Sequence, residues 1–453
     1  MNGSESSKIS AIEAVAQRAR DASRAMLSAS TDERNAALEA VHNSLLGAKD
    51  AIVAANEADK KAARELMEKG SLSSALVKRL DLAGKKFDAM LDGVKSVASL
   101  PDPVGACSLS RKLDDGLQLF RVACPIGVIC IIFESRPEAA VQIASLSIKS
   151  ANAVILKGGK EAEKSNAILV ETIRSALRSA NVPEDAVQLV ATREEVRELL
   201  DQTKYIDLII PRGSNSLVRY ISDNTKIPVM GHADGICSIY VDAKADPLKA
   251  KDIVVDAKAQ YPAVCNAAET LLIHKNALET VLPVVGKGLK EANVQVLADD
   301  ASKPILDAVP GLHVEASSPG DYRTEFLELR MAVKVVDSLS SAVTHINEHG
   351  SGHTDCIVTE DESSAQMFMA MVDSAGVYHN ASTRFADGFR YGFGAEVGVS
   401  THRTHARGPV GLEGLLIYKY MLKGNGHIVA PYANGEKKFK HEDTPGIKPV
   451  IDS

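Results

Sequence analysis

The stretch Gly127-Val-Ile-Cys-Ile-Ile-Phe133 decides the fold class, because it is a continuous run of apolar, mostly β-branched residues. Such a run is typical of a strand buried on both faces of a parallel sheet. A second run, Ala153-Val-Ile-Leu-Lys157, follows a helical stretch at 137–150. Further strands are expected at 186–190 and 206–210, with helices between them. This alternation with short connections predicts a doubly wound parallel sheet.

Other patterns flank this sheet. From residue 8 to about 98, apolar side chains recur at spacings of three and four without proline, so helices are expected. Residues 109–122 alternate polar and apolar side chains around Asp114-Asp115-Gly116, which predicts an isolated β-hairpin. A second α/β domain is expected from about 250 to 420. Its pattern predicts strands and helices near 238–241, 248–259, 270–273, 278–292, 333–336 and 357–359.

The composition is that of a globular, enzyme-sized chain, with 45% apolar and 25% charged residues among 453. Trp is absent, so the cores must consist of Ala, Val, Leu and Ile, which suits parallel strands covered by helices. The net charge is -7 and no dense Lys/Arg block occurs, so neither nucleic acid nor a membrane is an expected partner. The six cysteines form no CxxC pair and no secretory signal is recognisable, which favours a reducing, cytoplasmic location.

Nucleotide-binding signatures of the usual kind are missing. No GxGxxG sequence follows a predicted strand and no P-loop occurs. Three other loops follow predicted strands, namely Glu134-Ser-Arg-Pro137, Lys157-Gly-Gly-Lys160 and Pro211-Arg-Gly-Ser-Asn215. Each alone is also compatible with an ordinary helix start or a solvated turn. Three such loops at the carboxyl ends of strands in one sheet favour a cofactor site.

Cys265 is the candidate nucleophile. It lies in the segment 260–270, between a predicted helix and a predicted strand. A thiolate at this position could attack a carbonyl carbon and form a thioester. A small buried cysteine in a core is the alternative interpretation, and the segment alone does not decide between them.

Two histidine-rich segments allow further interpretations. His345, His349 and His353 are spaced by four, as metal ligands on a helix can be, but intervening glycines break the helix and no Cys or carboxylate completes a set. We therefore expect no metal site. The stretch 400–408 holds two His and two Arg without an acidic residue, which indicates either an anionic substrate or a solvated surface loop.

Six segments in order resemble the aldehyde dehydrogenase superfamily. They are FESRP (133–137), LKGGKEA (156–162), MGHADGIC (230–237), YPAVCNAAETLLIH (261–274), NASTRFADGFRYGFGAEVG (380–398) and ARGPVGLEGL (406–415). They are most similar to the branch that reduces an acyl phosphate of glutamate, and the resemblance covers residues 10 to about 423. It implies an α/β fold with a Rossmann-type NADP-binding domain at 1–108 and 123–249 and a catalytic domain at 250–422. Residues 109–122 and 423–453 would form an oligomerisation hairpin and a C-terminal extension.

The resemblance also implies roles for individual residues. Cys265 matches the catalytic nucleophile. Backbone N–H groups near it, with the side chain of Asn266 or of Ser135, are expected to hold the oxyanion. The following residues match cofactor-binding positions: Ser135, Arg136, Pro137, Lys157, Gly158, Gly159, Gly213, Ser214 and Glu325. The alignment near Glu325 could instead place Glu328 at the nicotinamide ribose. For the substrate we expect His232, Asn380, Ser382 and Arg407, with Arg136 as a further candidate.

The reaction implied by the resemblance is the reduction of L-glutamyl 5-phosphate to L-glutamate 5-semialdehyde and phosphate. NADPH would be the cofactor, and the reaction would be the second step of proline biosynthesis from glutamate. A homo-oligomer and a transient glutamate 5-kinase partner are expected as well.

One departure from the wider superfamily bears on mechanism. Hydrolytic members carry a water-activating Glu where this chain has Met230-Gly-His-Ala-Asp-Gly235. A missing water-activating base suits a reaction that needs no deacylating water. The nearest rival function is an NAD-dependent hydrolytic semialdehyde dehydrogenase, from which this chain differs at the missing Glu. A rival from another class is a non-catalytic scaffold.

Overall fold

The computed structural model describes residues 10–72, 74–191, 193–232 and 234–449. It divides the chain into two compact units. Unit 1 comprises Met1–Met230, Phe393–Gly398 and Val410–Ser453, and unit 2 comprises Gly231–Gly392 and Val399–Pro409. The division after Met230 falls earlier than the boundary predicted after residue 249. The reason is that strand β7 (Cys237–Val241) is hydrogen-bonded into the sheet of unit 2.

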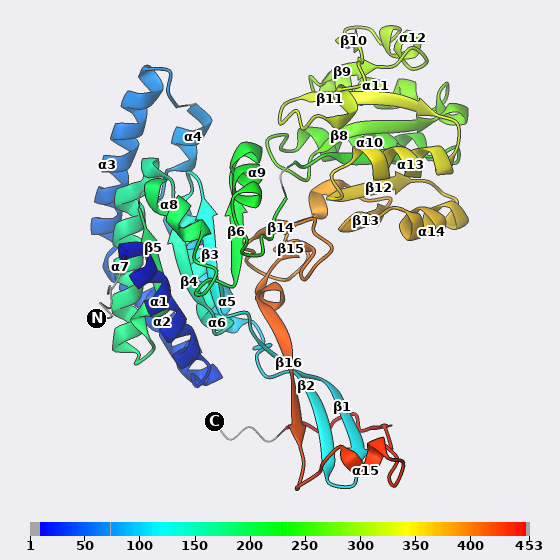
Figure 1. Ribbon diagram of the computed structural model, residues 1–453. Coiled ribbons are helices and arrows are strands. Elements are labelled where there is room, and N and C mark those ends of the chain that lie inside the picture. Colours follow the sequence, from blue (N-terminus) through cyan, green and yellow to red (C-terminus); the bar gives the residue numbers. More distant parts are fainter. Residues whose placement is uncertain (1–9, 73, 192, 233, 450–453) are drawn as a thin grey trace, which may run out of the picture. The chain divides into compact units, whose positions relative to one another are not determined.

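Unit 1 contains the doubly wound parallel sheet that the apolar runs predicted, which confirms that part of the fold (Figure 1). Its strand order is β5-β4-β3-β6, with β3 at Val128–Phe133, β4 at Ala153–Lys157, β5 at Val187–Val190 and β6 at Leu208–Arg212. All three strand pairs are parallel, and every residue of β3 and β4 is buried.

Helices cover both faces of this sheet. The crossover helices α6 and α7 pack against α2, α3 and α5, whereas α1 packs against β3, β4 and α8. The bounds are α1 Ala11–Met26, α2 Thr31–Gly47, α3 Lys49–Glu68, α4 Ser74–Arg79, α5 Lys85–Ser99, α6 Pro137–Lys149, α7 Glu163–Ser179, α8 Arg193–Leu200 and α9 Asn215–Asp223. The helical pattern predicted from residue 8 to 98 thus corresponds to α1–α5.

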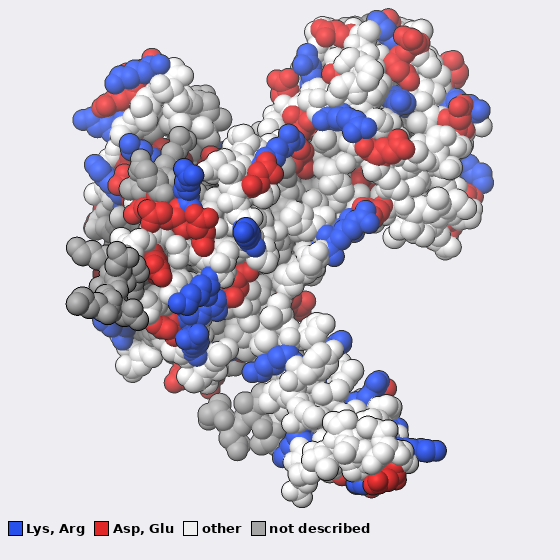
Figure 2. Space-filling view, viewed as in Figure 1, with Lys and Arg blue, Asp and Glu red and all other residues white. Residues whose placement is uncertain are grey.

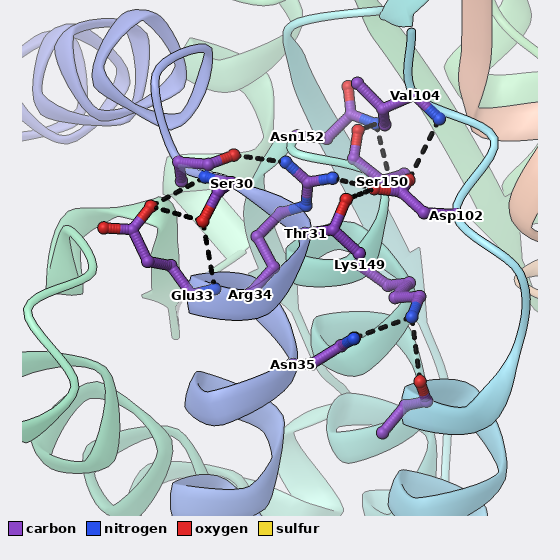
Figure 3. Close-up of polar contacts among 12 residues, drawn as sticks. Ser30, Thr31, Glu33, Arg34, Asn35, Asp102, Val104, Lys149, Ser150 and Asn152 are labelled. Carbon is purple, nitrogen blue, oxygen red and sulfur yellow. Dashed lines mark hydrogen bonds and ion pairs between the residues drawn. The ribbon is translucent and has the colours of Figure 1, made fainter. Parts of the chain in front are cut away.

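A buried polar network closes the amino ends of these strands (Figure 3). The Arg34 guanidinium of α2 bonds to the Asp102 carboxylate, and both side chains are almost fully buried. The ammonium of Lys149 donates to a carbonyl at the end of α5 at 2.8 Å. The Asn152 side chain accepts from the backbone N–H of Gly127 at 2.8 Å, directly before β3. The buried charges of this network therefore lie at the opposite end of the sheet from the predicted cofactor loops.

A small antiparallel sheet of unit 1 contains the predicted hairpin. Strands β1 (Cys107–Asp114) and β2 (Leu117–Pro125) pair around Gly116, whose φ of 75° suits glycine in a tight turn. The order is β16-β2-β1-β17, with β16 at Leu416–Lys423 and β17 at Glu442–Asp443. Strand β16 pairs along β2, so it belongs to this sheet rather than to the predicted catalytic domain. The short helix α15 (Ala430–Ala433) lies between β16 and β17.

Unit 2 is a second parallel α/β structure. Its sheet has the order β10-β9-β11-β8-β7-β12-β13, with β8 at Ala268–His274, β9 at Gln295–Ala298, β10 at Val314–Ala316, β11 at Arg330–Val336, β12 at Thr354–Val358 and β13 at Gly376–His379. One apolar core joins the sheet to α10 (Pro247–Ala259) and α11 (Leu282–Glu291). A second core on the other face joins it to α13 (Leu339–His349) and α14 (Glu362–Met371), as Figure 1 shows. The remaining elements are α12 (Lys303–Asp307), β14 (Gly398–Ser400) and β15 (Gly408–Val410).

The cysteines, the helices and the charged surface agree with the composition. All six cysteines are free thiols. Among the helices of the described residues, none is both long and apolar enough to cross a membrane. On the face shown in Figure 2, Lys and Arg side chains are interspersed with Asp and Glu side chains, in line with the absence of a basic block in the sequence.

Candidate active site

The three predicted cofactor loops of unit 1 lie at the carboxyl ends of β3, β4 and β6 and are bonded to each other. The backbone N–H and the hydroxyl of Ser135 donate to one carboxylate oxygen of Glu161, at 2.7 and 2.6 Å. The Glu134 carboxylate accepts from the backbone N–H of Ser214 at 2.9 Å. The structure therefore brings together Ser135 and Ser214, as predicted, through two glutamates whose role the sequence did not reveal.

The glycines of these loops leave room for protein side chains. A Cβ at Gly159 would lie 2.5 Å from the carboxyl carbon of Glu161, and a Cβ at Gly213 would lie 2.5 Å from a carboxylate oxygen of Glu134. At Gly158 a Cβ would meet the amide carbon of Asn166 at 3.0 Å. Glycine in such a loop also lets a ligand approach the backbone closely. The structure shows a further reason for glycine at these positions. A Cβ there would occupy the space of the Asn166, Glu161 or Glu134 side chain.

The remaining predicted cofactor residues of unit 1 flank the same loops. Lys157 ends β4 and is buried, and its ammonium donates to the carbonyl of Gly158. Arg136 is exposed at the N-cap of α6, and Pro137 occupies the first position of that helix. Ser135 has a φ of 46°, an unusual backbone conformation for a residue with a side chain, and its two bonds to Glu161 hold it there.

In unit 2, Cys265 lies in the loop between α10 and β8, as predicted, and is partly exposed. Gly235 packs directly against it, because a Cβ there would lie 2.5 Å from the Cα and 2.6 Å from the Cβ of Cys265. The thiol of Cys237 donates to the carbonyl of Cys265 at 3.3 Å. Burial raises the pKa of the Cys237 thiol well above its ordinary value, so this neighbour remains a neutral donor. The loop that carries Cys265, the predicted nucleophile, is thus fixed by a close backbone contact and a thiol hydrogen bond.

Asn266 attaches this loop to the segment that follows β13. Its side-chain amide donates to the carbonyl of Ala386 at 2.9 Å and accepts from the Arg384 guanidinium. Its backbone carbonyl accepts from the hydroxyl of Thr383 at 2.7 Å. Asn266 therefore positions the loop, and one amide hydrogen remains for the predicted oxyanion contact.

Arg384 is a buried cation that sequence reasoning missed. Its guanidinium also donates to the side chain of Gln260 at 3.0 Å, so it connects both ends of the loop that carries Cys265. Burial lowers the pKa of Arg384, and the neighbouring Arg390 lowers it further. The segment ASTRFADGF gave no local signal that this arginine, rather than another, would turn inward.

His232 and His353 lie beside Cys265. One ligating atom of each of the three residues falls within 4.8 Å of the others. The two imidazole rings are 5.2 Å apart between centroids and nearly perpendicular, at 81°. His232 was a predicted substrate residue, and its place in this cluster is consistent with a position near the nucleophile. His353 was considered only as a possible metal ligand together with His345 and His349.

The other predicted substrate residues have partners within unit 2. Asn380 bonds to the backbone of Thr359 through both ends of its amide, at 2.9 and 3.0 Å. Ser382 is buried, and its hydroxyl accepts from the backbone N–H of Arg384. The Arg407 guanidinium bonds to Asp373 at 3.0 and 2.7 Å, and its buried Nε–H has no partner among the described residues. Arg407 therefore keeps one buried nitrogen that bonds to none of the described residues.

A buried ion pair supports the loop that carries Glu325. Lys258 and Glu269 are fully buried, with 2.5 Å between ammonium and carboxylate. Burial raises the pKa of Glu269 to about 7 and lowers the pKa of Lys258. Glu269 also accepts from the backbone N–H of Leu327 at 3.4 Å, between the two candidates for the nicotinamide ribose, Glu325 and Glu328. Both candidates stay open, because they flank the same anchored residue, Leu327.

Comparison with known proteins agrees with this architecture. Residues 4–304 match the model of the aldehyde dehydrogenase family. The chain is 55% identical to the probable gamma-glutamyl phosphate reductase of Schizosaccharomyces pombe, over 83% of this chain and 84% of that protein. It is 54% identical to the gamma-glutamyl phosphate reductase of Acetivibrio thermocellus, over 82% and 84%.

A solved structure of a gamma-glutamyl phosphate reductase is similar to this chain as well. The crystal structure of gamma-glutamyl phosphate reductase from Thermotoga maritima is 39% identical, with a TM-score of 0.88 over 92% of this chain and 100% of that chain. The similarity thus extends over both units and is not confined to the predicted motifs. This chain belongs to the aldehyde dehydrogenase family and, within it, to the gamma-glutamyl phosphate reductases.

Proposed function

We propose that this chain reduces L-glutamyl 5-phosphate to L-glutamate 5-semialdehyde and phosphate with NADPH, the second step of proline biosynthesis from glutamate. The relatives named above support the activity, and the fixed loop around Cys265 is the structural observation that carries it. NADPH rather than NADH, and a cytoplasmic location, are the finer parts of this proposal and rest on the sequence resemblance.

Cys265 begins the proposed chemistry. Its thiolate attacks the acyl carbon, a carbon–sulfur bond forms, and the carbon–oxygen bond to phosphate breaks as inorganic phosphate leaves. NADPH, when bound, supplies the hydride that reduces the thioester. The resulting thiohemiacetal gives up its hydroxyl proton as the carbon–sulfur bond breaks, and the aldehyde is released. Asn266 and the backbone N–H groups of its loop are the proposed donors to the oxyanion.

The cofactor loops of unit 1 fit a nicotinamide nucleotide. They lie at the carboxyl ends of parallel strands, where such cofactors bind in doubly wound sheets. Ser214 is the N-cap of α9, yet its side chain does not cap that helix, which suits a phosphate at the helix N-terminus. Lys157, Ser135, Arg136, Pro137 and the glycines at 158, 159 and 213 would hold the remaining parts of the nucleotide, and Glu325 the nicotinamide ribose.

The lack of a water-activating Glu distinguishes the proposed reduction from hydrolysis of the thioester. The stretch 230–235 contains no Glu, and the imidazole of His232 there donates to the carbonyl of Val399 at 2.9 Å. A thioester that meets no activated water survives until hydride transfer. We assign the substrate carboxylate and phosphate to Arg407 and Ser382, with Arg136 as a further anion contact. His232, beside Cys265, is the polar side chain that would contact the developing alkoxide. The Asn380 amide, bonded to Thr359 at both ends, would support this segment rather than bind the substrate.

An exposed apolar row on β16 supports the proposed homo-oligomer. Three large exposed side chains alternate along one face of this strand, Tyr418, Tyr420 and Leu422, and Ile417 is exposed on the opposite face. A row of this kind on a sheet is typical of a protein–protein contact. A transient glutamate 5-kinase partner stays a prediction from the resemblance.

Substitution of the nucleophile tests the proposal. Cys265→Ala should reduce NADPH oxidation by at least about a thousandfold, because the thioester cannot form. Cys124→Ala is the matched control, since Cys124 is also partly exposed and lies outside both sites. The reverse reaction, NADP reduction by the semialdehyde, should require phosphate in the wild type. Turnover by Cys265→Ala would overturn the covalent mechanism, and reverse turnover without phosphate would favour a hydrolytic dehydrogenase.

A further inference from the structure

The cluster of His232, Cys265 and His353 has an arrangement beyond what the proposed reaction requires. The three residues come directly before or close to the amino ends of β7, β8 and β12, which are adjacent strands of one parallel sheet. This register brings one nitrogen, one sulfur and one further nitrogen atom within 4.8 Å of one another. A thiolate with two imidazoles is a donor set that suits Zn²⁺.

Both imidazoles are held as metal-binding histidines are. Nδ1 of His232 lies 2.9 Å from the carbonyl oxygen of Val399, and because a carbonyl only accepts, Nδ1 carries the proton. Nδ1 of His353 lies 2.9 Å from the hydroxyl of Thr354. Each hydrogen bond fixes the orientation of its ring. At His232 the lone pair of Nε2 is left for a metal; at His353 the same holds when the Thr354 hydroxyl accepts from Nδ1.

His353 supplies an independent indication of a ligand. The residue is only 1% exposed, yet its Nε2 has no hydrogen-bond partner among the described residues. A buried polar atom without a partner is costly, and an unrecorded ion or water is a usual explanation. The same ring lies against His232, and one of its nitrogens is within 4.8 Å of the Cys265 sulfur and of a His232 nitrogen, so this buried side chain borders the cluster.

We propose that His232, Cys265 and His353 form a reversible inhibitory site for Zn²⁺. Two Zn–N bonds and one Zn–S bond form, and the proton of the Cys265 thiol is released to solvent. The bound thiolate can no longer attack an acyl carbon, so occupancy by the metal and catalysis exclude each other. Metal binding does not rest on the proposed function; only the inhibition does. The proposed reaction itself uses no metal.

The decisive experiment measures binding without any substrate. The chelator-treated, full-length protein is titrated with Zn²⁺ in competition with a coloured zinc indicator, and one site per chain is expected. That site should be lost in Cys265→Ala. Loss of a residue that only hydrogen-bonds to a metal ligand weakens metal affinity by about 10- to 100-fold. His353→Asn and His232→Asn each remove a proposed ligand, so each should weaken Zn²⁺ affinity at least as much. His349→Asn is the control, because this histidine lies in another pair with His345 and should leave the affinity unchanged.

A second measurement needs no variant. Zn²⁺ should protect Cys265 from iodoacetamide, as followed by mass spectrometry of the labelled peptide, while the partly exposed Cys107 and Cys124 stay reactive. Equal binding by the wild type and by Cys265→Ala, or full alkylation of Cys265 at saturating Zn²⁺, would overturn the proposal. Unchanged affinity in both histidine variants would overturn it too, because the thiol alone would then hold the metal.

Inhibition is measured separately. Zn²⁺ should suppress NADPH oxidation, a chelator should restore it, and the acyl phosphate should compete with the metal. If the protein binds one Zn²⁺ through these residues but shows no reductase activity, the proposed function fails while the metal site stands. If it is active but binds no Zn²⁺, the metal site fails alone.

Discussion

The proposed cofactor loops of unit 1 and the loop of Cys265 in unit 2 lie at opposite ends of the parallel strands of their own sheets. In unit 1 the cofactor loops follow the carboxyl ends of β3, β4 and β6. In unit 2 the residues around the nucleophile precede the amino ends of β7, β8 and β12. Carboxyl ends of strands meet helix N-termini, whose N–H groups bind anions through the backbone. Amino ends of strands do not meet helix N-termini, so unit 2 relies on side chains and on the backbone of the loop that carries Cys265.

The two units also differ in where they bury charged side chains. Unit 1 keeps its buried Arg34–Asp102 pair at the amino ends of the strands, away from its loops (Figure 3). Unit 2 buries Lys258 and Glu269 at either end of the segment that carries Cys265. The comparison suggests that unit 1 tolerates changes of charge near its site better than unit 2 does. Lys258→Met and Glu161→Ala test this difference directly. Gly235→Ala and His345→Phe test how strongly unit 2 depends on its packing and on its buried histidine. The four follow from the largest expected effect to the smallest.

Removal of one partner of the buried pair should have the largest effect. Lys258→Met leaves the Glu269 carboxyl buried without its cation, which typically costs about 3–5 kcal/mol of unfolding free energy. Replacement of both groups, Lys258→Met with Glu269→Leu, should restore most of that loss, because no uncompensated charge remains. Urea denaturation of the wild type, the single and the double variant measures both. Equal destabilisation in single and double variants would show that packing, and not charge, is responsible.

The sequence predicts the parts of this comparison that depend on local pattern. The β-branched runs gave β3 and β4, and the Asp-Gly turn gave the hairpin, because burial on both faces and turn geometry are both visible in a few neighbouring residues. Strands β9, β10 and β13 were not predicted, since three or four residues carry little periodicity. The pairing of β16 with β2 joins residues far apart in the chain and leaves no local trace.

The site was predictable to a similar degree. Cys265 and the three loops were recognisable as segments between predicted elements. Arg384, Glu161 and His353 were not, because each owes its role to tertiary contacts with residues that lie well outside its own segment. The side chain of Asn380 was expected to face a substrate, but the structure bonds both ends of its amide to Thr359.

A methyl group beside the nucleophile should have the next largest effect. Gly235→Ala would force the backbone of Cys265 to move, and a displacement of about 1 Å typically costs about 100-fold in rate. NADPH affinity, measured by fluorescence titration, should be unchanged because unit 1 is untouched. Gly93→Ala in α5 is the control, since no described atom lies within 4 Å of a Cβ there. Normal kcat in Gly235→Ala would show that the loop can shift without loss of function.

A buried histidine gives unit 2 a dependence on pH. Burial, followed by the cationic neighbours His349, Lys334 and Arg323, lowers the pKa of His345 to about 3. The unfolded chain therefore takes up a proton below about pH 6.5 that the folded chain does not, so stability falls as pH falls. Between pH 6.5 and pH 5 this amounts to about 2 kcal/mol.

His345→Phe keeps the ring that packs edge-on against Tyr322 but cannot titrate. The unfolding free energy of this variant should therefore lose about 2 kcal/mol less than the wild type between pH 6.5 and pH 5. Parallel pH profiles for the two proteins would exclude His345 as the titrating group.

The smallest effect is expected in unit 1. Glu161→Ala removes both bonds that hold Ser135 in its left-handed conformation, so the loop must be ordered by the cofactor on binding. The Kd and the KM for NADPH should rise about tenfold, which is about 1.4 kcal/mol, while kcat and the KM for the acyl phosphate change little. Glu161→Gln keeps an acceptor for Ser135 and should recover most of the affinity. An equal rise of both KM values would mean that this glutamate supports the whole site, and the separation of roles between the two units would then not hold.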